Sequence, residues 1–241
     1  MNQESKIGKL YIVSTPIGNM EDITLRAIRI LGEVDIVFCE DTREGRKLLL
    51  HYKIVKPTDS FHAQSAGSKV EKIINLIKDG KNIALISDAG TPGISDPGVV
   101  LVRQIRELAP EIEIITVPGA SALTAALSIS GIPTDEFIFY GFLPHKKGRE
   151  TIFKEITGLK RTAVFYESPH RIMKTLESLK AHLDEKRTVA IAREMTKIYE
   201  EVFRGNASAV FQYYSENPDK IRGEFVVIIA PKSRTHLNKN G

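Results

Sequence analysis

The sequence contains one cysteine, Cys39. A single cysteine excludes a disulfide within the chain and a zinc site built from several cysteines. It stands in the apolar run IVFC at 36–39, which predicts a small buried core residue. The absence of a disulfide framework favours a reducing, cytoplasmic setting.

Long apolar runs are missing as well. No stretch of the sequence approaches the length of a membrane span. The first residues, MNQESKIGKLYIVS, lack the long apolar core and the small-residue cleavage site of a signal peptide. We therefore expect a cytoplasmic protein that is not inserted in a membrane.

Several motifs of common enzyme classes are also absent. No GxGxxG follows the first predicted strand, and no GxxxxGK[ST] or GxSxG occurs. The six histidines show neither HExxH nor another paired metal spacing. These absences disfavour dinucleotide oxidoreduction, P-loop phosphoryl transfer, serine hydrolysis and a metal centre. The sequence is more consistent with a cofactor of another type, held by backbone atoms and a few polar groups.

The 241 residues are 42% hydrophobic and 27% charged, which is ordinary for a soluble globular protein. Charge is unevenly distributed: residues 1–117 carry 15 Lys and Arg against 16 Asp and Glu, whereas residues 118–241 carry 19 against 14. A basic second half suggests a polyanionic partner such as nucleic acid. The alternative is a solvated surface with incidental charge.

Strands alternate with helices along the first half, which predicts a parallel sheet with right-handed crossovers. The second half should form a partly antiparallel sheet, because a short turn joins two of its strands. We expect an α/β protein with domains at 1–117 and 118–232 and a polar tail at 233–241. The expected strands are 10–14, 35–39, 82–86, 113–117, 137–140, 162–166, 188–193, 200–204 and 224–230. The expected helices are 24–31 with Gly32 as its stop, 44–51, 65–79, 99–108, 120–127, 149–156, 169–182 and 207–214.

The segment SDAGTPGISDPG at 87–98 is the most informative part of the sequence. It follows a predicted buried strand, and its Gly and Pro residues favour a stiff loop with close backbone approach. Such loops at the carboxyl ends of parallel strands bind ligands in open α/β sheets. Four other polar segments also follow strands: TPIGN at 15–19, CEDTR at 39–43, YESPHR at 166–171 and AREMTK at 192–197.

These segments, in order, resemble a known family. STPIGN with DITLRA, then CEDTR, SDAGTPGISDPG, VPGASA, GFLP, YESPHR and REMTKIYEE are similar to the tetrapyrrole methylase superfamily. Within it they resemble the ribosomal RNA small subunit methyltransferase I family over about residues 8–231. One departure follows Ser60-Phe61-His62, where this chain reads Ala-Gln-Ser and the family often has an acidic residue, His and Asn.

The resemblance implies two αβ domains, S-adenosylmethionine in the cleft between them, and a homodimer. It also implies methyl transfer to the ribose 2′-oxygen of a cytidine in small-subunit ribosomal RNA, with the RNA or the small subunit as the partner. We expect Asp88 to be the main polar contact of the cofactor, although a loop-capping aspartate is an alternative. For Ile94 and Met195 the alternative is core packing. The expected cofactor contacts are Pro16, Ile17, Asp88, Gly90, Ile94, Ser121, Ala122, Met195 and Pro231.

A base or hydrogen-bond acceptor should take the proton of a ribose hydroxyl as the new bond forms, although positioning and solvent could suffice without one. Asp41, Glu167, His170 and Glu194 follow predicted strands and are the candidates. A helix N-terminus favours the neutral form of His170, which could then accept a proton. Asp41 could equally belong to a structural ion pair. The candidate phosphate or ribose contacts are Arg43, His62, Arg171, Lys197 and Arg204.

Two alternatives remain at the level of the sequence. The first keeps the cofactor but methylates a corrin or porphyrin precursor on carbon. The second is a non-catalytic RNA-binding protein that retains the pocket. The basic second half, CEDTR and YESPHR argue against the first alternative, and the intact loop at 87–98 argues against the second.

Overall fold

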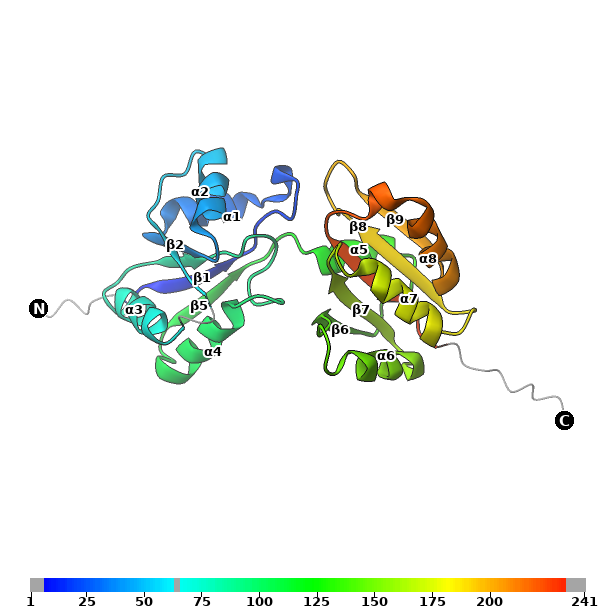
Figure 1. Ribbon diagram of the computed structural model, residues 1–241. Coiled ribbons are helices and arrows are strands. Elements are labelled where there is room, and N and C mark those ends of the chain that lie inside the picture. The colour runs from blue at the N-terminus through cyan, green and yellow to red at the C-terminus, as the bar shows by residue number, and fades with distance from the viewer. Residues whose placement is uncertain (1–6, 63–65, 233–241) are drawn as a thin grey trace, which may run out of the picture. The chain divides into compact units, whose positions relative to one another are not determined.

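The computed structural model describes residues 7–62 and 66–232. The chain divides between Ser121 and Ala122 into two compact units (Figure 1). The predicted tail at 233–241 and the Ala-Gln-Ser segment at 63–65 lie outside the described residues. None of the helices in the described part of the chain has the length and apolarity to cross a membrane.

The first unit is built on a parallel sheet with the strand order β3-β2-β4-β1-β5. All of its pairings are parallel, as the alternation of strands and helices predicted. The strands are β1 (Lys9–Val13), β2 (Ile36–Cys39), β3 (Thr58–Ser60), β4 (Ile83–Leu85) and β5 (Glu113–Val117). The helices are α1 (Leu25–Glu33), α2 (Thr42–His51), α3 (Ala66–Lys78) and α4 (Gly98–Leu108), with a 3-10 turn at Met20–Asp22.

Alternating side chains of this sheet form two cores, because successive residues of a strand point to opposite faces. Phe38 packs with residues of α3 and α4, and its neighbours Val37 and Cys39 pack with residues of α1 and α2. Figure 1 shows these helix pairs on the two faces of the sheet. Cys39 is fully buried, as predicted, and burial followed by the charge of Asp88 raises the pKa of its thiol to about 11.

The second unit has a mixed sheet with the order β6-β7-β10-β8-β9. β6 and β7 are parallel, and the other pairings are antiparallel, including the predicted pair β8 and β9. The strands are β6 (Phe137–Phe142), β7 (Thr162–Glu167), β8 (Thr188–Arg193), β9 (Glu201–Asn206) and β10 (Phe225–Ile229). The helices are α5 (Ala122–Ile129), α6 (Arg149–Gly158), α7 (Ile172–His182) and α8 (Ala207–Glu216), with a 3-10 turn at Pro218–Lys220.

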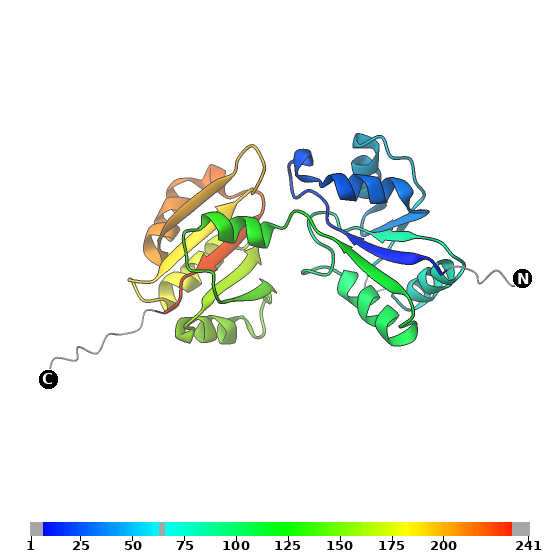
Figure 2. The ribbon, with the colours of Figure 1, turned by 180° about the vertical axis from the view of Figure 1, so that it is seen from behind.

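The main core of this unit lies between the sheet and α6, α7 and α8, where Phe153, Leu176 and Tyr214 are buried. Helix α5 packs near β10 on the opposite face, which Figure 2 shows from behind. β10 lies in the middle of the sheet, and its sequence FVVII is buried throughout. A central strand covered on both faces needs such a continuous apolar run.

Three of the differences between the structure and the predicted elements have clear local reasons. β3 was not predicted, because its three polar residues TDS show no apolar alternation. Helix α1 continues through Gly32 and ends at Glu33, since the Val34 amide still donates to the Ile30 carbonyl. Helix α7 begins at Ile172 rather than 169, after a turn in which the Arg171 and Ile172 amides both donate to the Ser168 carbonyl.

Candidate functional site

Three loops of the first unit are tied together where its parallel strands end. Thr15 after β1 and Gly90 after β4 exchange two backbone hydrogen bonds with N···O distances of 2.9 and 3.1 Å. The Ser14 and Thr91 hydroxyls lie 2.9 Å apart, and Thr91 donates onward to the Ala120 carbonyl after β5 at 3.2 Å. The segments TPIGN, SDAGTPGISDPG and PGAS therefore form one connected structure.

These loops approach one another closely at the backbone. Gly90 has a φ of +78°, and a Cβ there would lie 3.3 Å from the Ile17 side chain. A Cβ at Gly119 would lie 2.9 Å from Cβ of Ser14, closer than real side chains come. Ser95 also has a positive φ, of 63°, which is uncommon for a residue with a side chain. The loop at 87–98 is therefore constrained by both conformation and contact.

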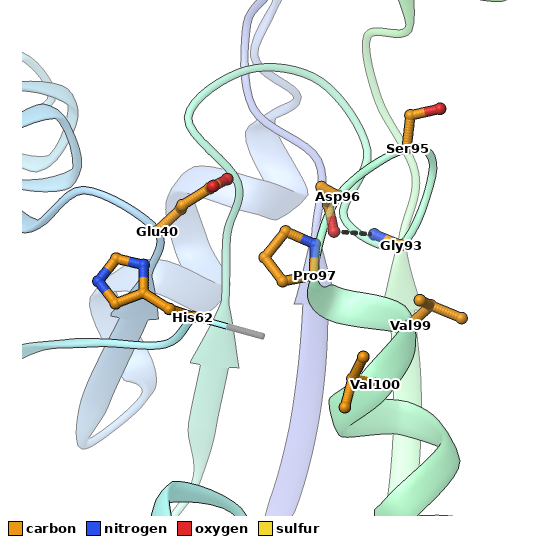
Figure 3. A pocket seen from close by; sticks show the side chains of 8 residues that line it. All are labelled: Glu40, His62, Gly93, Ser95, Asp96, Pro97, Val99 and Val100. Atoms are coloured by element: carbon orange, nitrogen blue, oxygen red, sulfur yellow. Dashed lines mark hydrogen bonds between the residues drawn. The ribbon is translucent and has the colours of Figure 1, made fainter. Parts of the chain in front are cut away.

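A cavity of about 600 Å³ lies beside the second half of this loop, within the first unit (Figure 3). Asp96 shapes its rim, because its Oδ1 atom accepts hydrogen bonds from the Gly93 and Gly98 amides, each at 2.6 Å. Figure 3 shows Glu40 and His62 side by side at another part of the cavity. The lining residues are Glu40, His62, Gly93, Ser95, Asp96, Pro97, Val99 and Val100.

Glu40 has an environment that suits a proton acceptor. Burial raises the pKa of its carboxyl, and the negative charges of Asp88 and Asp96 raise it further, while His62 acts in the opposite direction. A carboxylate with a raised pKa binds a proton more readily than a solvated one. Its proximity to the histidine and the cavity places this group where a small ligand could reach it.

Asp88, the predicted polar contact of the cofactor, braces the loop at 87–98. Its Oδ1 atom accepts a hydrogen bond of 3.0 Å from the Asp41 amide, which follows β2. Asp88 is otherwise exposed at the carboxyl ends of the strands. This contact matches the loop-stabilising alternative, and the cofactor role of Asp88 remains a prediction.

The other predicted cofactor residues are divided between the two units. In the first unit Pro16 and Ile17 are buried below the joined loops, and Ile94 is 46% exposed although it is apolar. This exposure does not match the core-packing alternative within the first unit, and the cofactor role of Ile94 remains a prediction. Gly90 and the partly buried Ser121 also belong to the first unit, and Ala122, Met195 and Pro231 belong to the second.

Asp41 and Arg43, predicted for catalysis and for substrate, form an ion pair with each other. Asp41 caps α2 by accepting from the Arg43 amide at 2.8 Å, and the Arg43 guanidinium lies 2.7 Å from its carboxylate. Hydrogen bonds from the side chain and backbone of Arg43 hold the pKa of Asp41 far below its usual range. Such a carboxylate is a weak base, so the arrangement matches the ion-pair alternative.

Glu194 and Lys197 are paired in the same way in the second unit. The Lys197 ammonium lies 2.9 Å from Glu194 and 3.0 Å from Glu224, and the Glu224 amide donates to Glu194. Burial acts to raise the pKa of Glu194, but the Lys197 ammonium outweighs it and the pKa is lowered. Glu194 also has a positive φ of 51°. These contacts stabilise the loop between β8 and β9.

Glu167 is buried, with a side-chain exposure of 0%. Arg149 and Arg171 lie 3.1 and 2.7 Å from its carboxylate, and the Thr175 hydroxyl donates to it at 2.6 Å. The predicted catalytic group is thus enclosed by partners, and the predicted phosphate contact Arg171 is one of them. These contacts give both residues a structural role in the second unit, and the catalytic role of Glu167 and the substrate role of Arg171 remain predictions.

The remaining predicted residues are exposed. His62 contributes to the cavity of the first unit, next to Glu40. His170 precedes α7 by two residues, and Arg204 lies on β9 with its guanidinium near Gly131. These three side chains belong to different parts of the chain, and only His62 lines the cavity.

Comparison with known proteins shows the family of this chain. Residues 9–210 match the family model of tetrapyrrole (corrin/porphyrin) methylases. The chain belongs to this family. It is 46% identical to ribosomal RNA small subunit methyltransferase I of Haemophilus influenzae over 96% of its length and 81% of the relative's length. It is 45% identical to the protein of the same name from Thermotoga maritima, over 94% of this chain and 100% of the relative. The Bacillus subtilis protein of that name is also 45% identical, over 99% and 80% of the two chains.

Solved methylase structures share the fold of this family member at low sequence identity. The methyltransferase CobJ matches with a TM-score of 0.66 and 18% identity, covering 95% of this chain and 97% of that one. Diphthine synthase matches with a TM-score of 0.73 and 14% identity, covering 94% and 91%. The predicted family, the α/β fold class and the assignment as a methyltransferase are confirmed.

The prediction from sequence missed Glu40 as a candidate in this methylase and named its neighbour Asp41. The signal was present in the alternation of β2: a residue two positions after Phe38 points to the same face of the sheet. That face is covered by α3 and α4, and the cavity lies at the start of α4. Arg149, which is 6% exposed, was missed because an arginine at a helix start reads as a surface residue.

Proposed function

We propose that this chain transfers a methyl group from S-adenosylmethionine to the ribose 2′-oxygen of a cytidine in small-subunit ribosomal RNA. The proposal rests on its 44 to 46% identity, over nearly the whole chain, to proteins named ribosomal RNA small subunit methyltransferase I. Three solved methylases named for tetrapyrrole substrates are 17 to 19% identical to this chain and support the fold alone. A tetrapyrrole substrate is therefore not favoured.

The joined loops of the first unit fit the proposed cofactor. The cofactor has polar and apolar parts, and these loops expose the polar side chain of Asp88 and the apolar side chain of Ile94. When bound, S-adenosylmethionine supplies an activated methyl group on a sulfonium. Ser121 and Asp88 are proposed as further contacts in this unit. Ala122, Met195 and Pro231 of the second unit are proposed from the family resemblance.

We assign Glu40 as the group that accepts the proton of the ribose hydroxyl. Its raised pKa and its place beside the cavity support this role over Asp41, Glu167 and Glu194, whose carboxylates are held by cations. His62 would orient Glu40 or the ribose from the same cavity. The substrate is proposed to be small-subunit RNA, free or in the subunit, and the chain is proposed to act as a homodimer.

The experiment uses the purified chain, radiolabelled S-adenosylmethionine and small subunits from cells that lack this modification. Mapping of the labelled nucleotide should find one cytidine with a 2′-O-methyl group. A parallel reaction with protein-free ribosomal RNA tells which form is the substrate. Sedimentation or light scattering at the assay concentration measures the oligomeric state.

Incorporation into a base, or transfer to a tetrapyrrole precursor in place of RNA, would contradict the proposed acceptor. Binding of RNA without transfer under conditions in which calorimetry detects the cofactor would contradict the proposed chemistry. A matched reaction with the Glu40→Gln protein excludes a contaminating methyltransferase, because a contaminant would be unaffected by that change.

A further inference from the structure

One edge of the second unit exposes two lysines together with two histidines. His145, Lys146 and Lys147 are exposed in the loop that follows β6, and His170 is exposed in the loop that follows β7. Because β6 and β7 are parallel neighbours, the loops after them lie at the same edge of the sheet. We call the surface formed by His145, Lys146, Lys147 and His170 the β6–β7 basic surface.

A buried ion-pair network holds these two loops against each other. Arg171, from the loop after β7, donates to the Leu143 carbonyl in the loop after β6 at 2.9 Å. Arg149 donates to the Pro144 carbonyl of that loop at 3.3 Å. Both guanidiniums also bind the fully buried carboxylate of Glu167. The exposed cations therefore stand on a fixed backbone rather than on a loose loop.

The network neutralises the acidic group below the surface and leaves the exposed cations without acidic partners. Residues 143–149 and 167–172 contain four Lys and Arg against one Glu, and that one is the buried Glu167. None of the acidic side chains in the described residues pairs with Lys146 or Lys147. Glu150, the nearest acid along the chain, lies 3.3 Å from His182. The surface is therefore positive.

The backbone beside the two lysines is open. Gly148 has a φ of +89°, and a Cβ placed there would meet no atom within 4 Å. It precedes α6 without a side-chain hydrogen bond to cap the helix. Space for a bulky group therefore exists next to the cations, and the start of α6 adds a favourable field for an anion to the charge of the lysines.

We propose that the β6–β7 basic surface binds the phosphodiester backbone of the RNA substrate, on the strand that flanks the methylated nucleotide. This inference rests on the proposed function, because it takes ribosomal RNA as the substrate. Lysine ammoniums contact phosphates as point charges and read no base, so the surface supplies affinity and orientation rather than sequence recognition. In this proposal the segment YESPHR contributes to the surface through His170 and supports it through Glu167 and Arg171.

The test compares two charge-reversed proteins of equal net charge. One carries Lys146→Glu and Lys147→Glu. The control carries Lys160→Glu and Lys186→Glu, two exposed lysines that precede β7 and β8 and so lie at the opposite edge of the same sheet. Binding of a fluorescent fragment of the small-subunit RNA is measured over a range of salt concentrations. Cofactor binding is measured by calorimetry and folding by thermal melting.

We expect the Lys146/Lys147 protein to bind RNA about tenfold or more weakly than the unmodified protein at ~0.15 M salt. The slope of the logarithm of its RNA-binding constant against the logarithm of salt concentration should be shallower by about 1 to 2. Its KM for RNA should rise, whereas its kcat at saturating RNA and its cofactor affinity should match the unmodified protein. The control should change RNA affinity by about twofold at most, since exposed charges are screened beyond ~8 Å.

Equal RNA affinity and salt slope in the Lys146/Lys147 protein and the unmodified protein would overturn the inference, as would an equal loss in the control. If the unmodified protein methylates RNA while the lysine variants bind normally, only the surface is refuted. If no protein transfers a methyl group but the lysine-dependent binding persists, the surface stands and only the proposed function fails. Should charge reversal lower the melting temperature, Lys146→Ala with Lys147→Ala must still weaken RNA binding.

Discussion

The two units hold their loops in place by different interactions. In the first unit the loops at the strand ends are joined by backbone hydrogen bonds between Thr15 and Gly90 and by the hydroxyls of Ser14 and Thr91. In the second unit the corresponding loops are joined through charged side chains, with Glu167 bound by two buried guanidiniums. The hydrogen bonds of the first unit are neutral, so they add no charge where a ligand would bind. The buried ion pairs of the second unit fix its loops, and other cations of those loops remain exposed.

The electrostatic character of the units follows the same division. The first 117 residues carry a slight excess of acid, and their cavity contains Glu40 and Asp96. Residues 118–241 carry an excess of five positive charges, although Arg234 and Lys239 lie outside the described part. The difference agrees with the proposed roles, in which the first unit accepts the proton and the second attracts the RNA backbone.

The largest effect on activity is expected from Glu40→Gln. Removal of a proton acceptor should lower kcat by about 10²- to 10⁴-fold while cofactor affinity is retained. In the unmodified protein, activity should fall as the pH drops through the raised pKa of Glu40, because the carboxylate must be unprotonated to accept a proton. Single-turnover rates over a pH series measure both effects. The exposed Glu44, changed to Gln, is the control, and an equal loss there would remove Glu40 from the mechanism.

The largest effect on stability is expected from Glu167→Ala. Two guanidiniums would lose their buried counter-charge, which should lower the free energy of unfolding by about 3 to 5 kcal/mol. Urea unfolding of the whole chain measures it. In the matched control, Glu136→Ala, the carboxylate is 74% exposed and pairs with Arg161, so the change should be about 1 kcal/mol or less. Similar values for the two proteins would show that the buried ion pairs of Glu167 do not stabilise the second unit.

An intermediate effect is expected from Gly90→Ala in the first unit. A positive φ costs an L-residue about 1 to 2 kcal/mol, and the added Cβ would press against Ile17 at 3.3 Å. Both stability and cofactor affinity should fall, as denaturation and calorimetry would show. Gly32→Ala should instead stabilise the protein by about 0.5 to 1 kcal/mol, because Gly32 lies within a helix and nothing lies within 4 Å of its Cβ position. Unchanged cofactor binding in Gly90→Ala would separate this loop from the cofactor site.

The smallest effect concerns the ion pairs of Asp59 with Lys69 and Lys72. Burial acts to raise the pKa of Asp59, but the two lysines outweigh it and lower the pKa to about 2. An aspartate with a depressed pKa stabilises the fold above its unfolded value of about 3.9, and this contribution is lost as the pH falls toward 2. Because the groups are partly exposed, we expect about 1 kcal/mol or less. In the Asp59→Asn protein, the free energy of unfolding should fall less as the pH is lowered toward 2. If its pH dependence is unchanged, other carboxylates cause the loss of stability in acid.

Much of the fold could be predicted because its signals are local. The apolar strands and periodic helices of both units lie close to where the sequence places them. The exceptions have local reasons as well: β3 is three polar residues, and α7 starts late because Ser168 accepts two amides in a preceding turn. The loop at 87–98 was predictable from its Gly and Pro content and from the strand before it.

The candidate site was predictable only to the level of its loops. Like Glu40, the carboxylates of Asp41, Glu167 and Glu194 lie at or just after the end of a strand, and the sequence does not rank them. Their ion-pair partners distinguish them, because Asp41 pairs with Arg43 and Glu194 pairs with Lys197. Arg149 and Glu167 are 18 positions apart, and no local pattern connects them.

The order of strands and helices, the parallel and mixed sheets, the stiff loop and the family membership were determined by the amino-acid sequence, because each depends on periodicity or on a contiguous motif. The tertiary structure decided which carboxylates are neutralised, which one faces a cavity and which cations remain exposed. A carboxylate's proton affinity and a cation's availability depend on burial and on partners distant in the chain, and only the folded arrangement supplies those.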